Sequence, residues 1–228
     1  MPDDAFNAVS KATDLDMALS NGEDVVLGTD LTFSSQDTTA NSGYGATGVS
    51  VKGGTFDGNG KTLTVTNANG TWDSAVHTTG GTIKNLTVSG AMRGIFMGSA
   101  TKDLYIDNVV FDDVVYTFNS DGGSKEYGVY ISNSTLNGWT SWSNVHKEIE
   151  FTNCKFGEGC GYAFMNAYQS VTFKDCDFAE GFEVNPANTS TYLTFENCTY
   201  NGVLITKDNV ADVLYAASDA YLCIVNND

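Results

Sequence analysis

The 228-residue chain is strongly acidic, with 28 Asp and Glu residues against 11 Lys and Arg residues and a net charge of −17. This balance argues against nucleic acid and anionic membranes as partners, because both are bound through Lys and Arg. No apolar run approaches the ~18 residues of a membrane span, and residues 1–6 lack the basic and apolar parts of a secretory signal peptide.

The N-terminal segment predicts a cap followed by short strands. Residues 12–22 have the pattern of a short helix that ends at a glycine. Apolar segments at 25–27 and 30–33 predict two strands, and the Gly-rich segment 57–63 (DGNGKTL) predicts a turn. We assign residues 1–30 to an N-terminal cap.

A short apolar pattern with Asn or Asp at its centre then occurs six times. In each copy this pivot lies two residues after one apolar residue and three before another, and successive pivots are 20–25 residues apart. A repeat of this length made of short strands predicts a solenoid, with coils over residues 31–202. The pivots are Asn85, Asn108, Asn133, Asn153, Asp175 and Asn197.

The apolar phase changes at each pivot, and this change predicts a corner. Around Asn153, strict alternation from Phe151 would turn Cys154 outward. The sequence instead keeps Cys154 and Phe156 apolar, so the chain must bend between them and Phe151. Asn and Asp tolerate the left-handed backbone conformation that such a bend requires. We therefore expect the six pivots to stack as a ladder whose amides bond to neighbouring coils.

Three of the five cysteines, Cys154, Cys176 and Cys198, directly follow a pivot at intervals of 22 residues. They should stack on successive coils as small apolar core residues. Neighbouring coils lie ~4.8 Å apart, so a disulfide between two of them stays open. The spacing of the cysteines does not predict a zinc site.

The chain is therefore predicted to be one all-β domain, a single-stranded parallel β-helix with a C-terminal cap at 203–228. Within this cap, residues 208–217 have helical spacing and residues 221–225 predict a last strand. The ladder resembles the right-handed parallel β-helix of the pectin-lyase-like superfamily, in which an Asn ladder occupies the corner between two of three sheets. The N-terminal helix, strand and DGNGKTL segment look like the start of β-helical surface proteins of bacteria and phages.

Members of that superfamily often cleave acidic polysaccharides, using an Arg or Lys base and carboxylate-bound calcium. Here Arg93 is the single arginine, and we interpret it as a surface residue. Related hydrolases carry Asn-x-Asp, Asp-Asp, Gly-His-Gly and Arg-x-Lys segments, of which only Asp112-Asp113 is present. We predict no catalytic residue, and the sequence leans against an enzyme without deciding the question.

Calcium is the one cofactor that the sequence leaves open. The candidate ligands are Asp175, Asp177 and Glu196, which should lie close together in the stack and offer oxygen ligands. Each has a competing structural role. Asp175 is a corner residue, and the other two should face Lys155 and Lys174 respectively.

Four aromatic residues are candidates for binding a glycan or a protein partner. Trp139 and Trp142 lie in a polar stretch between two repeats, and Tyr127 and Tyr130 precede it. Exposed rings beside polar groups stack on sugars or anchor partners. The alternative is a loop folded over the coil with its rings packed down.

The first functional hypothesis is a non-enzymatic structural or attachment protein on the exterior of a virion, as a capsid decoration or fibre. Its partners would be other virion or cell-surface proteins, and viral fibres of this fold class imply a homotrimer by resemblance. The alternatives are a secreted bacterial adhesin or glycan-binding domain, and a polysaccharide lyase or hydrolase. All three place the protein on a virion, outside the cell or on its surface.

Overall fold

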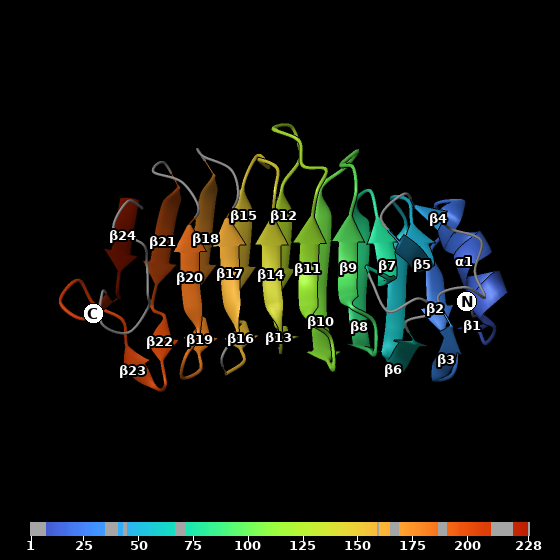
Figure 1. Ribbon diagram of the computed structural model, residues 1–228, viewed down its shortest axis with the longest axis horizontal. Coiled ribbons are helices and arrows are strands. Elements are labelled where there is room, and N and C mark those ends of the chain that lie inside the picture. Colours follow the sequence, from blue (N-terminus) through green and yellow to red (C-terminus); the bar gives the residue numbers. More distant parts are fainter. Residues whose placement is uncertain are drawn as a thin grey trace, which may run out of the picture.

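The computed structural model describes residues 8–34, 41–42, 45–66, 72–158, 160–164, 169–186, 191–210 and 221–227. It is a parallel β-solenoid of about six turns with one short helix near its N-terminus, which confirms the predicted fold class. Figure 1 shows the coils stacked along the long axis of the molecule, from the helix at one end to β24 at the other.

Two sheets make up the walls of the solenoid. The long sheet has 16 strands: β1 (Ala8–Val9), β2 (Val25–Leu27), β3 (Leu31–Ser34), β6 (Thr55–Thr66), β8 (Gly81–Ser89), β10 (Leu104–Asp112), β12 (Val129–Ser132), β13 (Thr135–Leu136), β15 (Ile149–Thr152), β16 (Lys155–Phe156), β18 (Ser170–Lys174), β19 (Asp177–Phe178), β21 (Tyr192–Glu196), β22 (Thr199–Tyr200), β23 (Val203–Leu204) and β24 (Tyr221–Val225). The short sheet has eight: β4 (Asn41–Ser42), β5 (Gly45–Val51), β7 (Ser74–Thr78), β9 (Arg93–Met97), β11 (Tyr116–Ser120), β14 (Trp139–Trp142), β17 (Gly161–Phe164) and β20 (Glu183–Pro186).

The N-terminal end is covered by helix α1 (Ala12–Ser20). Its Leu15 and Leu19 are buried, and the helix packs against β5. Gly22 follows with a φ of 79°, a left-handed conformation that glycine adopts at helix ends without steric cost. The helix predicted for residues 12–22 is therefore confirmed.

The registers of the long sheet stack equivalent apolar residues of successive coils. Phe151, Phe173 and Phe195 lie on neighbouring strands with ring centroids 5.1 Å apart in each step. Phe156 and Phe178 stack in the same way at 4.8 Å. All five side chains are buried, so the stacking of coils hides faces that a single coil would expose. The same column continues toward the N-terminus as Ile131, Ile106 and Ile83.

All six pivots have left-handed backbone conformations, with φ between 50° and 54°. Their side chains lie at an exposed or half-buried corner rather than in the interior. The ladder is interrupted twice: the Asp175 side chain has no N–H group to donate to Asn153, and Asn133 donates to Asp107 instead of Asn108. Side-chain hydrogen bonds join the corner into three short chains that each end on a carboxylate: Asn108 to Asn85 to Asp57, Asn153 to Asn133 to Asp107, and Asn197 to Asp175.

The Gly-rich segment 57–63 is not a separate turn, and this prediction was wrong. It lies within β6 as a bulged version of the same corner, with Asn59 at a φ of 52° and Gly60 at 72°. Asn59 is therefore a seventh corner residue. Asp57 pairs with Lys84, and Lys61 pairs with Leu86. More residues separate Asp57 from Lys61 than separate their partners, so this segment does not match the spacing of the six repeats.

At the C-terminal end, β24 pairs in parallel with β21, as the sequence predicts. The antiparallel pair β22–β23 was not anticipated. Most of the helix expected at 208–217 lies outside the described residues. In the part of the chain that is described, none of the helical structure is long and apolar enough to cross a membrane.

Candidate functional site

Arg93, the candidate lyase base, lies on β9 and is 2% exposed, which corrects its interpretation as a surface residue. Its guanidinium carbon lies 4.0 Å from the ring centroid of Phe96, and Nη1 donates to Asn119 Oδ1 at 3.3 Å. Burial lowers the pKa of Arg93 to about 10, while the nearby Asp121 and Asp73 oppose this shift. The group therefore stays charged at neutral pH, fixed within the wall and shielded from a substrate.

A serine–histidine pair connects β11 to the segment that follows β14. Ser120 Oγ lies 2.7 Å from His146 Nε2, a separation typical of a nucleophile and its base. Both side chains are buried, at 0% and 2% exposure, and His146 Nδ1 has no hydrogen-bond partner in the described parts of the chain. Burial lowers the pKa of His146 to about 4, so the imidazole is neutral at neutral pH. Both groups are therefore enclosed in the core and shielded from a substrate.

Of the four candidate aromatic residues, Trp139 and Trp142 are packed into the wall, and Tyr127 lies half-buried in the segment before β12. Trp139 and Trp142 belong to strand β14 instead of a loop. Trp142 is 1% exposed and packs on Phe118 at 4.6 Å between centroids, so it is a core residue and cannot stack on a sugar. Trp139 is half-buried, and its ring lies on the backbone of Gly161, where an added Cβ would meet it at 2.1 Å. The alternative reading, with the rings packed down, describes these two residues.

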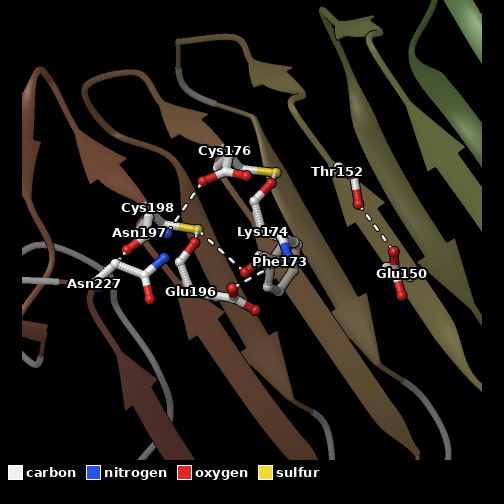
Figure 2. Close-up of polar contacts among 10 residues, drawn as sticks. Glu150, Thr152, Phe173, Lys174, Cys176, Glu196, Asn197, Cys198 and Asn227 are labelled. Carbon is white, nitrogen blue, oxygen red and sulfur yellow. Dashed lines mark hydrogen bonds and ion pairs between the residues drawn. The ribbon is translucent and has the colours of Figure 1, made fainter.

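The proposed calcium ligands are engaged elsewhere. Asp175 accepts from Asn197 and Asp177 from Thr199, while Glu196 Oε1 lies 3.2 Å from Lys174 Nζ. Figure 2 shows Lys174 beside Glu196 on neighbouring strands. Within the described ranges, His, Cys, Asp and Glu form no group of three or more arranged to hold a metal ion.

The three stacked cysteines are buried free thiols. Each sulfur lies within hydrogen-bond distance of two backbone carbonyl oxygens, as Cys198 Sγ does with Phe173 at 3.3 Å and Glu196 at 3.4 Å (Figure 2), so its single S–H can donate to either one. Burial is the main cause that raises the pKa of the central thiol, Cys176, so this group is a protonated donor. The column therefore contributes packing and hydrogen bonds within the core.

The outer face of the long sheet carries an aromatic pair that the sequence only half revealed. Tyr105 on β10 and Tyr130 on β12 are in register, with ring centroids 5.1 Å apart and an interplanar angle of 14°. Tyr105 is 47% exposed. Tyr130 was a candidate, but Tyr105 was missed because it belongs to the preceding coil. Aligning the repeats would have revealed it, because Tyr105 and Tyr130 each directly precede the first apolar residue of their repeats.

On β2, β6 and β8 of the same sheet lies a surface depression with a volume of about 450 Å³. Its polar lining includes Asp57 and Lys84, whose Oδ2 and Nζ atoms are 3.3 Å apart. Burial acts to raise the pKa of Asp57, but hydrogen bonds from Asn59 and Asn85 and the charge of Lys84 together hold it below the usual value. The depression thus presents an ionised carboxylate and an ammonium group side by side.

The outer wall of the long sheet thus carries exposed polar and aromatic groups, while Arg93, Ser120 and His146 are enclosed in the core. Comparison of the chain with models of known protein families, with curated proteins and with solved structures gave no match.

Proposed function

We propose that this protein is a non-enzymatic structural or attachment module carried on the exterior of a virion, as a decoration or fibre segment. In this proposal it belongs with the pectin-lyase-like β-helices, acts as a homotrimer and contacts other virion or cell-surface proteins. A secreted adhesin would use the same walls in the same way.

The observation that carries the proposal is the burial of Arg93, the candidate lyase base, and of the Ser120–His146 pair. Arg93 is enclosed against Phe96, and the Ser120–His146 pair is enclosed beneath the short sheet. A general base must reach the proton that it removes, either directly or through one water molecule. These groups instead stiffen the wall that they occupy, which suits a rigid spacer.

A cleavage assay tests this proposal. The purified protein is incubated with acidic and neutral polysaccharides, and the release of unsaturated ends and reducing ends is followed. We expect no release above that of the heat-denatured protein. Light scattering of the same sample measures the oligomeric state, for which we expect a trimer.

Release of new ends by the folded protein would overturn the non-enzymatic proposal. Arg93→Lys and His146→Gln variants would then show whether either enclosed group is responsible. A monomer at all concentrations would overturn the trimer but leave the structural role in place.

A further inference from the structure

The free face of the Tyr105 ring borders an open strip of the outer wall. Strand β10 lies between β12 and β8, so the ring face that does not contact Tyr130 is directed toward β8. The residues in register with Tyr105 on the next two strands are Thr82 on β8 and Thr55 on β6. Both are short, and adjacent strands are about 4.8 Å apart. A flat ring stacked on Tyr105 would therefore stand above Thr82.

The depression continues this strip across β6 to β2. It is lined by Asp24, Val25, Val26, Thr55, Asp57 and Lys84. Thr55 thus belongs to both the strip and the depression, which joins them into one surface. Asp57 and Lys84 point outward because Phe56 and Ile83, their neighbours along the strands, are buried in the core. The surface offers one apolar ring face followed by hydrogen-bond donors and acceptors.

The aromatic end of this surface is held in place before any ligand arrives. The hydroxyl of Tyr130 donates to Glu148, which raises the pKa of Tyr130 and keeps it a donor. Its ring leans over Gly128, where an added Cβ would lie 2.6 Å from the hydroxyl oxygen. Tyr105 stacks on this fixed ring. A rigid aromatic group loses little conformational entropy on binding.

We propose that this surface binds a neutral pyranose unit of a polysaccharide, stacked on Tyr105 over Thr82, with its hydroxyls bonded to Lys84 and Asp57. A pyranose has an apolar C–H face and a polar rim, which match an aromatic ring beside charged hydrogen-bonding groups. Two carboxylates against one ammonium group, within a chain of net charge −17, disfavour uronic acids. This inference rests on the proposed attachment function and names its ligand class.

The test measures the binding of soluble neutral polysaccharides, namely a β-glucan, a galactomannan and an α-glucan, by affinity electrophoresis and calorimetry. Polygalacturonate is the acidic comparison. We expect at least one neutral polymer to bind more tightly than polygalacturonate. Tyr105→Ala should weaken that binding by about tenfold, which corresponds to about 1.4 kcal/mol and lies within the range of an aromatic contact. Tyr105→Phe keeps the ring and should bind nearly as well as the unchanged protein.

Two further variants separate stacking from general surface effects. Thr82→Trp fills the strip beside Tyr105 and should abolish binding without removing any ligand contact of Lys84 or Asp57. Tyr192→Ala removes a tyrosine of similar exposure, 50%, on β21 of the same sheet and should leave binding unchanged. Thermal unfolding checks that each variant is folded.

Equal binding by Tyr105→Ala and the unchanged protein would overturn the inference, as would the failure of all three neutral polymers to bind. Neither result touches the attachment role, which depends on the absence of cleavage. Release of ends from a polymer that binds at Tyr105 would instead keep the sugar site and overturn the non-enzymatic proposal.

Discussion

The long sheet and the short sheet enclose the same core but are built from different kinds of side chain. Inward columns of the long sheet are almost wholly apolar, as in the stack of Phe151, Phe173 and Phe195. The short sheet buries the polar side chains Thr78, Ser120 and Thr140. Periodic apolar stacking thus characterises the long sheet, while the short sheet places polar side chains in the core.

Removing a stacked ring should give the largest loss of stability. Phe173→Ala deletes a fully buried side chain that stacks on a phenylalanine on each side, and we expect it to cost about 3–5 kcal/mol in the free energy of unfolding. Urea denaturation measures this. Thr172→Ala, a half-buried neighbour on the same strand, is the control and should change little. A loss below about 1 kcal/mol for Phe173→Ala would contradict stacking as the source of long-sheet stability.

A pH titration addresses the short sheet next. The pKa of His146 is lowered to about 4 by burial, so the unfolded chain takes up a proton near the ordinary value of 6.5 while the folded chain does not. Stability should therefore fall as pH drops from about 6.5 to 4, by about 3 kcal/mol from this residue. His146→Gln should remove that part of the pH dependence, measured by urea denaturation at each pH. An unchanged slope would show that His146 is not buried as a neutral group.

The corner joins two strands of the long sheet, and its substitution separates backbone conformation from hydrogen bonding. Asn153→Ala loses both the left-handed preference and the bond to Asn133 Oδ1 of 2.8 Å, and should cost about 2 kcal/mol. Asn153→Gly keeps the conformation and should cost about 1 kcal/mol. Thermal unfolding of the two variants gives the difference. Equal losses would mean that the backbone at this corner is not constrained.

The smallest expected effect has the opposite sign. The buried Oγ1 of Thr140 on β14 lacks a hydrogen-bond partner in the described structure. Replacing this hydroxyl by a methyl group in Thr140→Val removes an uncompensated polar group at constant volume. We expect stabilisation of up to about 1 kcal/mol by urea denaturation. Destabilisation would indicate that the hydroxyl is paired in solution.

The long sheet was predictable because its apolar pattern repeats with little variation. One phase change at each pivot located the corners, and the intervals between pivots gave the register of Phe151, Phe173 and Phe195. The short sheet carries no such repeat. Its strand β14 contains two tryptophans among polar residues, so the sequence predicts a polar stretch with exposed rings or a loop there, because burial of Thr140 and Trp142 depends on contacts with other coils.

The candidate site was harder to predict for the same reason. Ser120 and His146 are 26 residues apart and meet only through the turn of one coil. Tyr105 stands outside every motif, and its exposure depends on the short threonines of the two neighbouring strands. The spacing of the repeats predicts that Thr82 and Thr55 lie in register with Tyr105. The exposure of the Tyr105 ring, however, could be judged only from the three-dimensional structure.

The corner amides also have a direction. In each of the three chains the side-chain N–H groups donate toward the N-terminal end, and the chain stops where a carboxylate receives the last one. Each Asn at the corner can both donate and accept, whereas the Asp175 carboxylate can only accept. An extra turn that carries an Asn could therefore be inserted with a hydrogen bond to the turn before it. A copy of the turn that carries Asp175 would instead place two carboxylates side by side with no N–H group between them.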